Sequence, residues 1–129
     1  MKNAKIYIQS LHKSFPVRHS NKNMRESYKF QLAMAKVGQI TDVNDPDEQF
    51  NLASSYSDKL VDFPVTVLKL NDKQAEQLDD MEQDELQKLD VRLALTVQGL
   101  SEHEINETIR DMEDATKSNN NKSGQKGQK

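Results

Sequence analysis

The sequence predicts a mainly α-helical fold, in which an N-terminal β-hairpin precedes a small bundle of four to five helices and a disordered C-terminal tail. Apolar residues alternate with polar ones near the N-terminus, recur at helical spacing through most of the chain, and are absent from residues 117–129. We expect residues 1–114 to form a single small domain, with residues 1–20 as the hairpin, residues 21–114 as the helical part and residues 115–129 as the disordered polar and basic tail.

Two short strands are predicted before residue 20. Ile6 and Ile8 alternate with Tyr7 and Gln9, Phe15 and Val17 alternate in the same way, and residues 10–14 separate the two segments. Pro16 has no N–H group to donate, so it belongs at an edge position. The pattern therefore predicts a two-stranded hairpin, which would be only marginally stable by itself.

A first helix is predicted between a capping signal at Ser20 and a stop at Gly38. Its buried face is predicted from an apolar stripe of Met24, Tyr28, Leu32 and Ala35, widened by Phe30, Met34 and Val37. On the other side of the same helix, the basic residues Lys22, Arg25, Lys29 and Lys36 fall along one stripe.

A long second helix is predicted to start at Asp45, with Pro46 in its first position. Apolar residues keep helical spacing from Phe50 to Leu70, but Pro64 interrupts the run and removes one backbone hydrogen bond. Residues 65–70 also alternate as a strand would. Because the helical spacing continues in phase across Pro64, we favour a kinked helix.

Three further helices are predicted. Asn71 or Asp72 caps a short one, and the apolar stripe from Leu86 to Leu100 gives a longer one that ends at Gly99. Residues 91–97 also alternate, but segment length and the helix formers before them favour a helix. A capping box at residues 101–104 then starts a final helix, whose apolar face is Ile105, Ile109 and Met112.

Charge is sorted along the chain. Residues 1–38 carry 8 basic and 1 acidic residue, residues 39–114 carry 6 basic and 20 acidic, and the last fifteen add four lysines, which gives the net charge of −3. Opposed blocks of this size indicate a protein whose parts meet different surfaces. We therefore expect a binding protein.

Several function classes lack their sequence signals. The chain has no cysteine, which excludes disulfides and thiolate sites, and no apolar run approaches the length that spans a bilayer. Residues 42–53 resemble a calcium loop only superficially, because Pro46, Asp47 and Ala53 occupy three of its essential positions. The three histidines are scattered. We expect no catalytic residue, no metal, no cofactor, no membrane partner and no secretion.

The candidate partner-binding residues lie in the first helix. They are the basic residues Lys22, Arg25, Lys29 and Lys36, with Met24 and Met34 as adaptable apolar contacts. Other interpretations stay open for both sets of residues. The basic stripe is either an ordinary helix exterior or an internal match to the acidic half of the chain. The methionines fill the core. A nucleic-acid-associated regulator would use the basic third of the chain, and an acidic inhibitor that mimics nucleic acid would use residues 79–90. The acidic remainder disfavours a nucleic acid partner.

Residues 68–78, 84–88 and 98–105, the last reading QGLSEHEI, occur in order behind a short hairpin. In the order of these segments and in its size, the chain resembles the tail assembly chaperones of long-tailed phages that infect Gram-positive bacteria. The resemblance implies a non-enzymatic protein that coats the tape-measure protein and associates with itself. It also implies a longer frameshifted form that recruits tail tube protein, a location in the host cytoplasm and absence from the mature virion.

Overall fold

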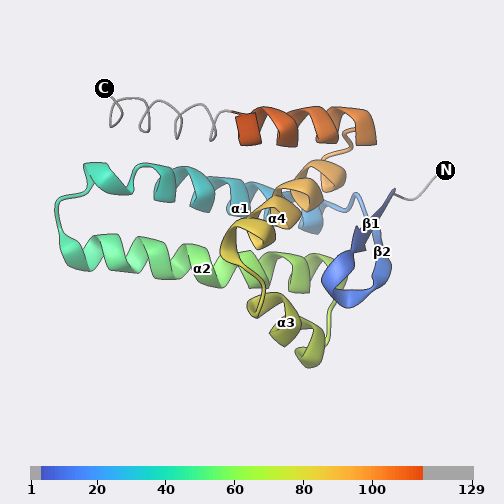
Figure 1. Cartoon of the computed structure of the whole chain (residues 1–129), viewed down its shortest axis with the longest axis horizontal. Helices are drawn as coiled ribbons and strands as arrows, with labels where there is room; N and C mark the ends of the chain where they lie inside the picture. The colour runs from blue at the N-terminus through green and yellow to red at the C-terminus, as the bar shows by residue number, and fades with distance from the viewer. Residues whose placement is uncertain (1–3, 115–129) are drawn as a thin grey trace, which may run out of the picture.

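A computed structural model describes residues 4–114 and confirms the mainly helical fold with an N-terminal hairpin (Figure 1). The predicted disordered tail, residues 115–129, lies outside the described residues. The division of the chain into one domain and a tail stays a prediction.

The hairpin consists of β1 (Ala4–Ile8) and β2 (Lys13–Val17), joined by the 3-10 turn η1 (Gln9–Leu11). The strands are antiparallel, with Ile6 opposite Phe15. Ile6, Ile8, Phe15 and Val17 are buried, so the predicted alternation is confirmed and Tyr7 points outward at 58% exposure. The apolar face packs on the helices, which supply the burial that a lone hairpin lacks.

The helices are capped largely as predicted. Ser20 accepts a hydrogen bond from the Asn23 N–H at 3.1 Å, and Asp45 accepts one from the Asp47 N–H at 3.0 Å. Asn71 is the residue that caps the short helix, through a reciprocal capping box with Gln74. The helices are α1 (Asn21–Gly38), α2 (Pro46–Leu68), α3 (Asp72–Asp79), α4 (Gln83–Val97) and a C-terminal helix over residues 102–114, with the 3-10 turn η2 (Ile40–Asp42) between α1 and α2.

Both ambiguous segments are helical. Residues 65–68 continue α2 beyond Pro64, and the helix ends at Lys69, which adopts the left-handed conformation with φ 56°. Residues 91–97 belong to α4. In each case one face of the helix is buried, and this tertiary packing outweighs the local alternation.

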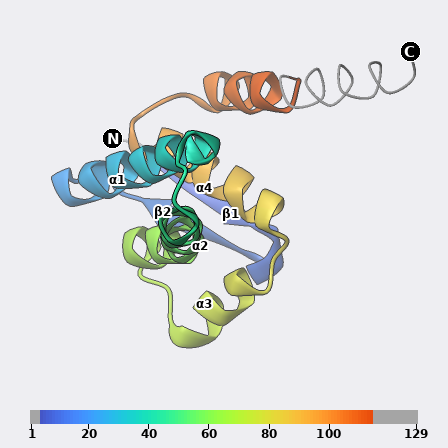
Figure 2. The same cartoon turned by 90° about the vertical axis from the view of Figure 1, so that its left-hand side faces the viewer.

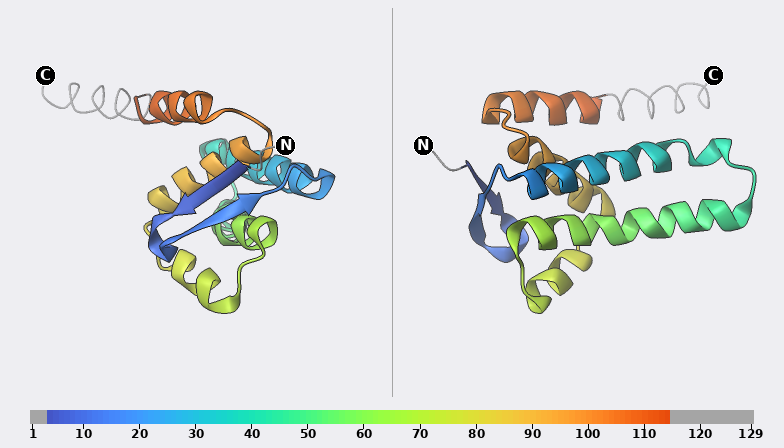
Figure 3. Two further views of the ribbon diagram at one scale, coloured as in Figure 1. Left: turned by 90° about the vertical axis from the view of Figure 1, so that its right-hand side faces the viewer. Right: turned by 180° about the vertical axis from the view of Figure 1, so that it is seen from behind.

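α1 and α2 form an antiparallel pair that α4 crosses on one side, while the β-hairpin and α3 lie at the end of the pair away from η2 (Figures 1 and 2). The centre of the core is aromatic: the Phe30 ring stacks on Phe63 at 5.2 Å and on Tyr56 at 6.3 Å between centroids. None of residues 31–55 is buried, so the η2 half of the pair projects from the core (Figure 3).

The predicted buried face of α1 is confirmed in part: Phe30 is buried and Met24, Met34 and Val37 pack partly buried against the core, but the placement of Tyr28 and Leu32 on this face is wrong. Asn23, Ser27 and Phe30 are the buried residues, whereas Tyr28 and Leu32 are 55% and 57% exposed. The polar side chains tolerate burial because they bond locally: Ser27 donates to the Met24 carbonyl at 2.6 Å and Asn23 to the Arg18 carbonyl at 3.0 Å. The α1 residues around Phe30 therefore face the core, and the Tyr28–Leu32 side faces outward.

Gly99 follows α4 with φ 93°, a conformation that side chains rarely adopt. We expect Gly99→Ala to lower the free energy of unfolding by about 1 kcal/mol, because the added methyl group strains this backbone. Urea denaturation measures the change. Gly38→Ala is the control, since an added Cβ there meets nothing within 4 Å, and it should be neutral or slightly stabilising. If both variants lose the same free energy of unfolding, the left-handed conformation of Gly99 is not the cause of the loss.

Candidate protein-binding site

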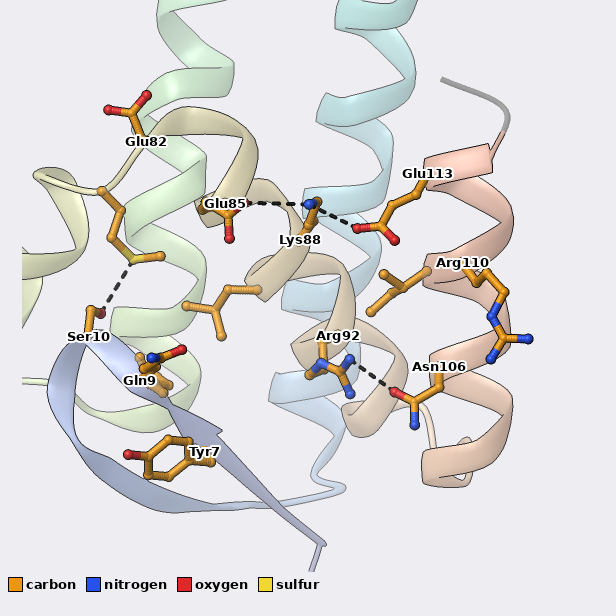
Figure 4. A pocket seen from close by; sticks show the side chains of 14 residues that line it. Tyr7, Gln9, Ser10, Glu82, Glu85, Lys88, Arg92, Asn106, Arg110 and Glu113 are labelled. Carbon is orange, nitrogen blue, oxygen red and sulfur yellow. Dashed lines mark hydrogen bonds and ion pairs between the residues drawn. The ribbon is translucent and has the colours of Figure 1, made fainter. Parts of the chain in front are cut away.

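A groove of about 850 Å³ lies between the β1–η1 segment, α4 and the C-terminal helix (Figure 4). It exists because the C-terminal helix rests on the rest of the fold through few side chains: in this helix only Ile105 is buried, while Ile109 and Met112 are partly buried. The outward side of β1, which carries Tyr7, forms the edge of the groove opposite the C-terminal helix. Three segments distant in the sequence thus form one surface.

The groove is lined by apolar side chains and by charged side chains of both signs. Tyr7, Met81, Leu89 and Ile109 provide apolar surface. The charged residues are Glu82, Glu85, Lys88, Arg92, Arg110 and Glu113. Such a mixed lining suits an amphipathic helix, which carries apolar and charged side chains together.

Polar contacts hold the C-terminal helix beside α4. Lys88 pairs with Glu113 at 2.9 Å and with Glu85 at 3.5 Å, and Arg92 donates a hydrogen bond to Asn106 at 3.0 Å. The hydrogen bond to Glu113 is the main reason that the pKa of Lys88 is raised, and the nearby carboxylate charges add to it. Because these contacts are solvent-exposed, each stabilises the helix only weakly.

A second groove, of about 870 Å³, continues the same surface along β1 and α4 toward the start of the C-terminal helix. Tyr7 and Arg92 line both grooves. Tyr7 therefore stands in the middle of an extended surface, as an exposed aromatic side chain on a rigid strand. Aromatic residues placed this way are common anchors in protein interfaces.

The six residues that the sequence singled out do not gather on one surface. Lys22, Arg25, Lys29 and Lys36 are exposed on α1, whereas Met24 and Met34 are partly buried against the core. Lys29 and Lys36 line a groove between α1 and α2, which Lys22 and Arg25 do not reach. The partner-binding role of these six residues stays a prediction.

Sequence reasoning missed the groove beside α4, although one signal pointed to it. The alternation that buries Ile6 and Ile8 necessarily turns Tyr7 outward. What no local pattern revealed is that α4 and the C-terminal helix would pass next to this side of the strand.

Asp90 on α4 is fully buried, and neither of its carboxylate oxygens has a hydrogen-bond partner. Burial raises the pKa of Asp90 well above its ordinary value. The nearby Tyr56 hydroxyl donates instead to Gln87 at 2.6 Å, and its pKa is raised to about 12 by burial and by the charge that Asp90 carries when ionised. Asp90 lines neither groove beside α4.

Within residues 4–114, no three histidine or acidic side chains come together as a metal site would require. The helices of this described part are also too short or too polar to cross a membrane.

Comparison with known proteins gives one family. The family described as phage tail assembly chaperone proteins, TAC, has a model that matches residues 4–115. No curated protein and no solved structure matches the chain. The matched residues include the hairpin, all the described helices and both grooves beside α4.

Proposed function

Because the chain belongs to the family of phage tail assembly chaperone proteins, we propose that it binds the tape-measure protein and assists assembly of the tail tube without catalysing a reaction. The resemblance seen in the sequence is confirmed for the family, while a Gram-positive host stays an expectation. Action in the host cytoplasm and absence from the mature virion belong to the same proposal.

The groove between β1, α4 and the C-terminal helix is the observation that carries this proposal. A long helical client exposes more apolar surface than it can bury alone, and such surface aggregates unless another protein covers it. The apolar side chains of the groove, Tyr7 and Leu89 among them, offer that cover, and its charged side chains of both signs accept a client whose own charges alternate.

Recruitment of the tail tube protein through a longer frameshifted form is part of the proposal. It rests on the family resemblance alone. Detection of a second, larger product of the same gene in infected cells, with tube protein bound to it, tests this part. If no such larger product is found, the recruitment of tube protein is contradicted and only the binding of the tape-measure protein stays proposed.

Capture of the tape-measure protein of the same phage tests the central function. We expect co-expressed wild-type chain to keep the tape-measure protein soluble and to be purified with it. Tyr7→Ala should weaken this capture by about tenfold or more, since it removes an aromatic anchor from the middle of the surface.

Tyr28→Ala is the matched control, because Tyr28 is the same residue type with nearly the same exposure, 55% against 58%, and lines neither groove beside α4. Capture that falls equally in both variants, or that falls only with Tyr28→Ala, would contradict this placement of the client. Failure of the wild-type chain to capture the tape-measure protein would contradict the function itself.

A further inference from the structure

The C-terminal helix, residues 102–114, itself lies on the surface proposed for the client. It lines the first groove beside α4 with Asn106, Ile109, Arg110 and Glu113, and the second with Glu102 and Ile105. The two grooves share Tyr7 on β1 and Arg92 on α4. The helix therefore covers part of one surface that runs along β1 and α4 (Figure 4).

Only limited packing holds the helix on this surface. Ile105 is the one buried side chain of residues 102–114 and is not part of the central core cluster. Ile109 and Met112 are partly buried. The ion pair and the hydrogen bond to α4 are exposed to solvent, so each adds little. The helix is therefore among the segments that detach from the rest of the fold at the lowest cost.

α4 does not need the C-terminal helix to stay in place. The α4 residues that belong to the central core cluster as buried side chains are Leu86, Val91, Leu93, Ala94 and Val97. Lys88, Leu89 and Arg92 are half-buried and line the first groove instead. If the C-terminal helix leaves, this side of α4 becomes open while the core stays packed.

The apolar side chains that the helix places on this surface follow one spacing. Ile105, Ile109 and Met112 stand at positions i, i+4 and i+7, which form a single stripe on a helix. This is the spacing by which amphipathic helices dock in grooves of other proteins. The C-terminal helix thus contacts the rest of the fold as a bound helical partner would.

Two polar groups complete the pattern. Asn106 accepts a hydrogen bond from Arg92 at 3.0 Å, and Glu113 pairs with Lys88 at 2.9 Å (Figure 4). These acceptors stand at i+1 and i+8, two helical turns or about 10.5 Å apart. A carboxylate can replace the amide of Asn106, because the guanidinium of Arg92 only donates. The surface therefore selects a helix with one apolar stripe and two acceptors two turns apart.

We propose that the C-terminal helix is an internal substitute for the client, which covers this side of α4 until a client helix with the same pattern replaces it. The inference rests on the proposed function and deepens it, because it names the pattern that the chain recognises. In the complex Lys88 takes a carboxylate of the client and Arg92 takes a second acceptor. Before a client is present, the helix keeps the apolar side chains beneath it away from water.

A labelled synthetic peptide with the sequence of residues 101–114 tests the covered surface in the full-length chain. In the wild type the tethered helix occupies the surface at a high effective concentration, so the peptide should bind weakly. I109S/M112S removes apolar contacts of the tethered helix and should raise the affinity for the peptide by about tenfold or more. Fluorescence anisotropy of the peptide measures the affinity, and circular dichroism verifies that each variant is folded.

H103S/E107S is the matched control. It introduces the same two serines in the same helix, at side chains that are 83% and 58% exposed, and it should bind the peptide as weakly as the wild type. K88E, added to I109S/M112S, should lower the affinity by about fivefold, because it reverses one charge of an exposed pair. A peptide that carries E113K should recover this loss.

Equal binding of the peptide by the wild type and by I109S/M112S would overturn the proposal, as would a loss with K88E that the E113K peptide does not recover. Capture of the tape-measure protein separates this inference from the proposed function, and I109S/M112S should capture more of it than the wild type. If I109S/M112S binds the peptide but no variant captures the tape-measure protein, the covered surface is supported and the proposed function fails. If the wild type captures it and I109S/M112S gains nothing, the function stands and this inference fails.

Discussion

Asp90→Leu is expected to raise the free energy of unfolding by about 2 to 3 kcal/mol at neutral pH. The wild-type carboxyl group is fully buried and both of its oxygens lack a hydrogen-bond partner, so folding removes it from water without compensation. Leucine has a similar shape and gains from the same burial. Urea denaturation of the two proteins measures the difference.

The effect of Asp90 depends on pH. Burial holds the pKa of the folded-state carboxyl group above the ordinary value of 3.8, so between these two pKa values the unfolded chain binds fewer protons than the folded one. The stability of the wild type therefore falls, relative to the variant, as pH rises above 3.8, and the difference levels off above the folded-state pKa.

Asp90→Asn separates the charge from the shape, because the amide cannot ionise. Its stability advantage over the wild type should likewise grow as pH rises above 3.8 and should almost vanish in acid. A wild type that is more stable than both variants at neutral pH would show that the carboxylate has a favourable partner in the folded protein.

Phe30→Ala is expected to cost about 3 to 5 kcal/mol, the range typical of a buried phenylalanine. The Phe30 ring is fully buried and stacks on Phe63 and Tyr56, so the variant would leave a cavity where α1, α2 and α4 meet. For a chain of this size such a loss approaches the whole stability. Thermal or urea denaturation followed by circular dichroism measures it.

Leu32→Ala is the control on the same helix. Leu32 was expected on the buried stripe, but its side chain is 57% exposed, so truncation should change the stability by less than about 0.5 kcal/mol. If Leu32→Ala loses as much stability as Phe30→Ala, Leu32 is buried as the sequence pattern predicted.

Local chemistry explains why the elements were predictable. Ser20, Asp45 and Ser101 cap helices through neighbouring backbone N–H groups, and Gly99 ends one through its own conformation, so each boundary depends on a few adjacent residues. The alternation of Ile6 and Ile8 fixed the inward side of the hairpin for the same reason. For residues 65–70 and 91–97, which also alternate like strands, the helix was predicted from the phase of the apolar spacing and from the length of the segment.

The features that the sequence did not predict depend on contacts between residues far apart in the chain. α1 has two overlapping apolar sides, and only the position of Phe63 and Tyr56 on α2 decides that Phe30 faces inward. Asp90 belongs to the acidic residues 79–90 that the sequence assigned to an alternative inhibitor surface, and its burial follows from the packing of α4 on α1 and α2. The groove around Tyr7 depends on three segments that no short pattern relates.

Site-specific cross-linking to the tape-measure protein tests the placement of the client most directly, because the chain has no cysteine of its own. Tyr7→Cys and Tyr28→Cys each offer one attachment point for a photoactivated cross-linker, with similar exposure, but only Tyr7 lines the grooves beside α4. We predict that the tape-measure protein cross-links from position 7 and not from position 28. Cross-linking from position 28 alone would contradict the assignment of the client to the groove beside α4.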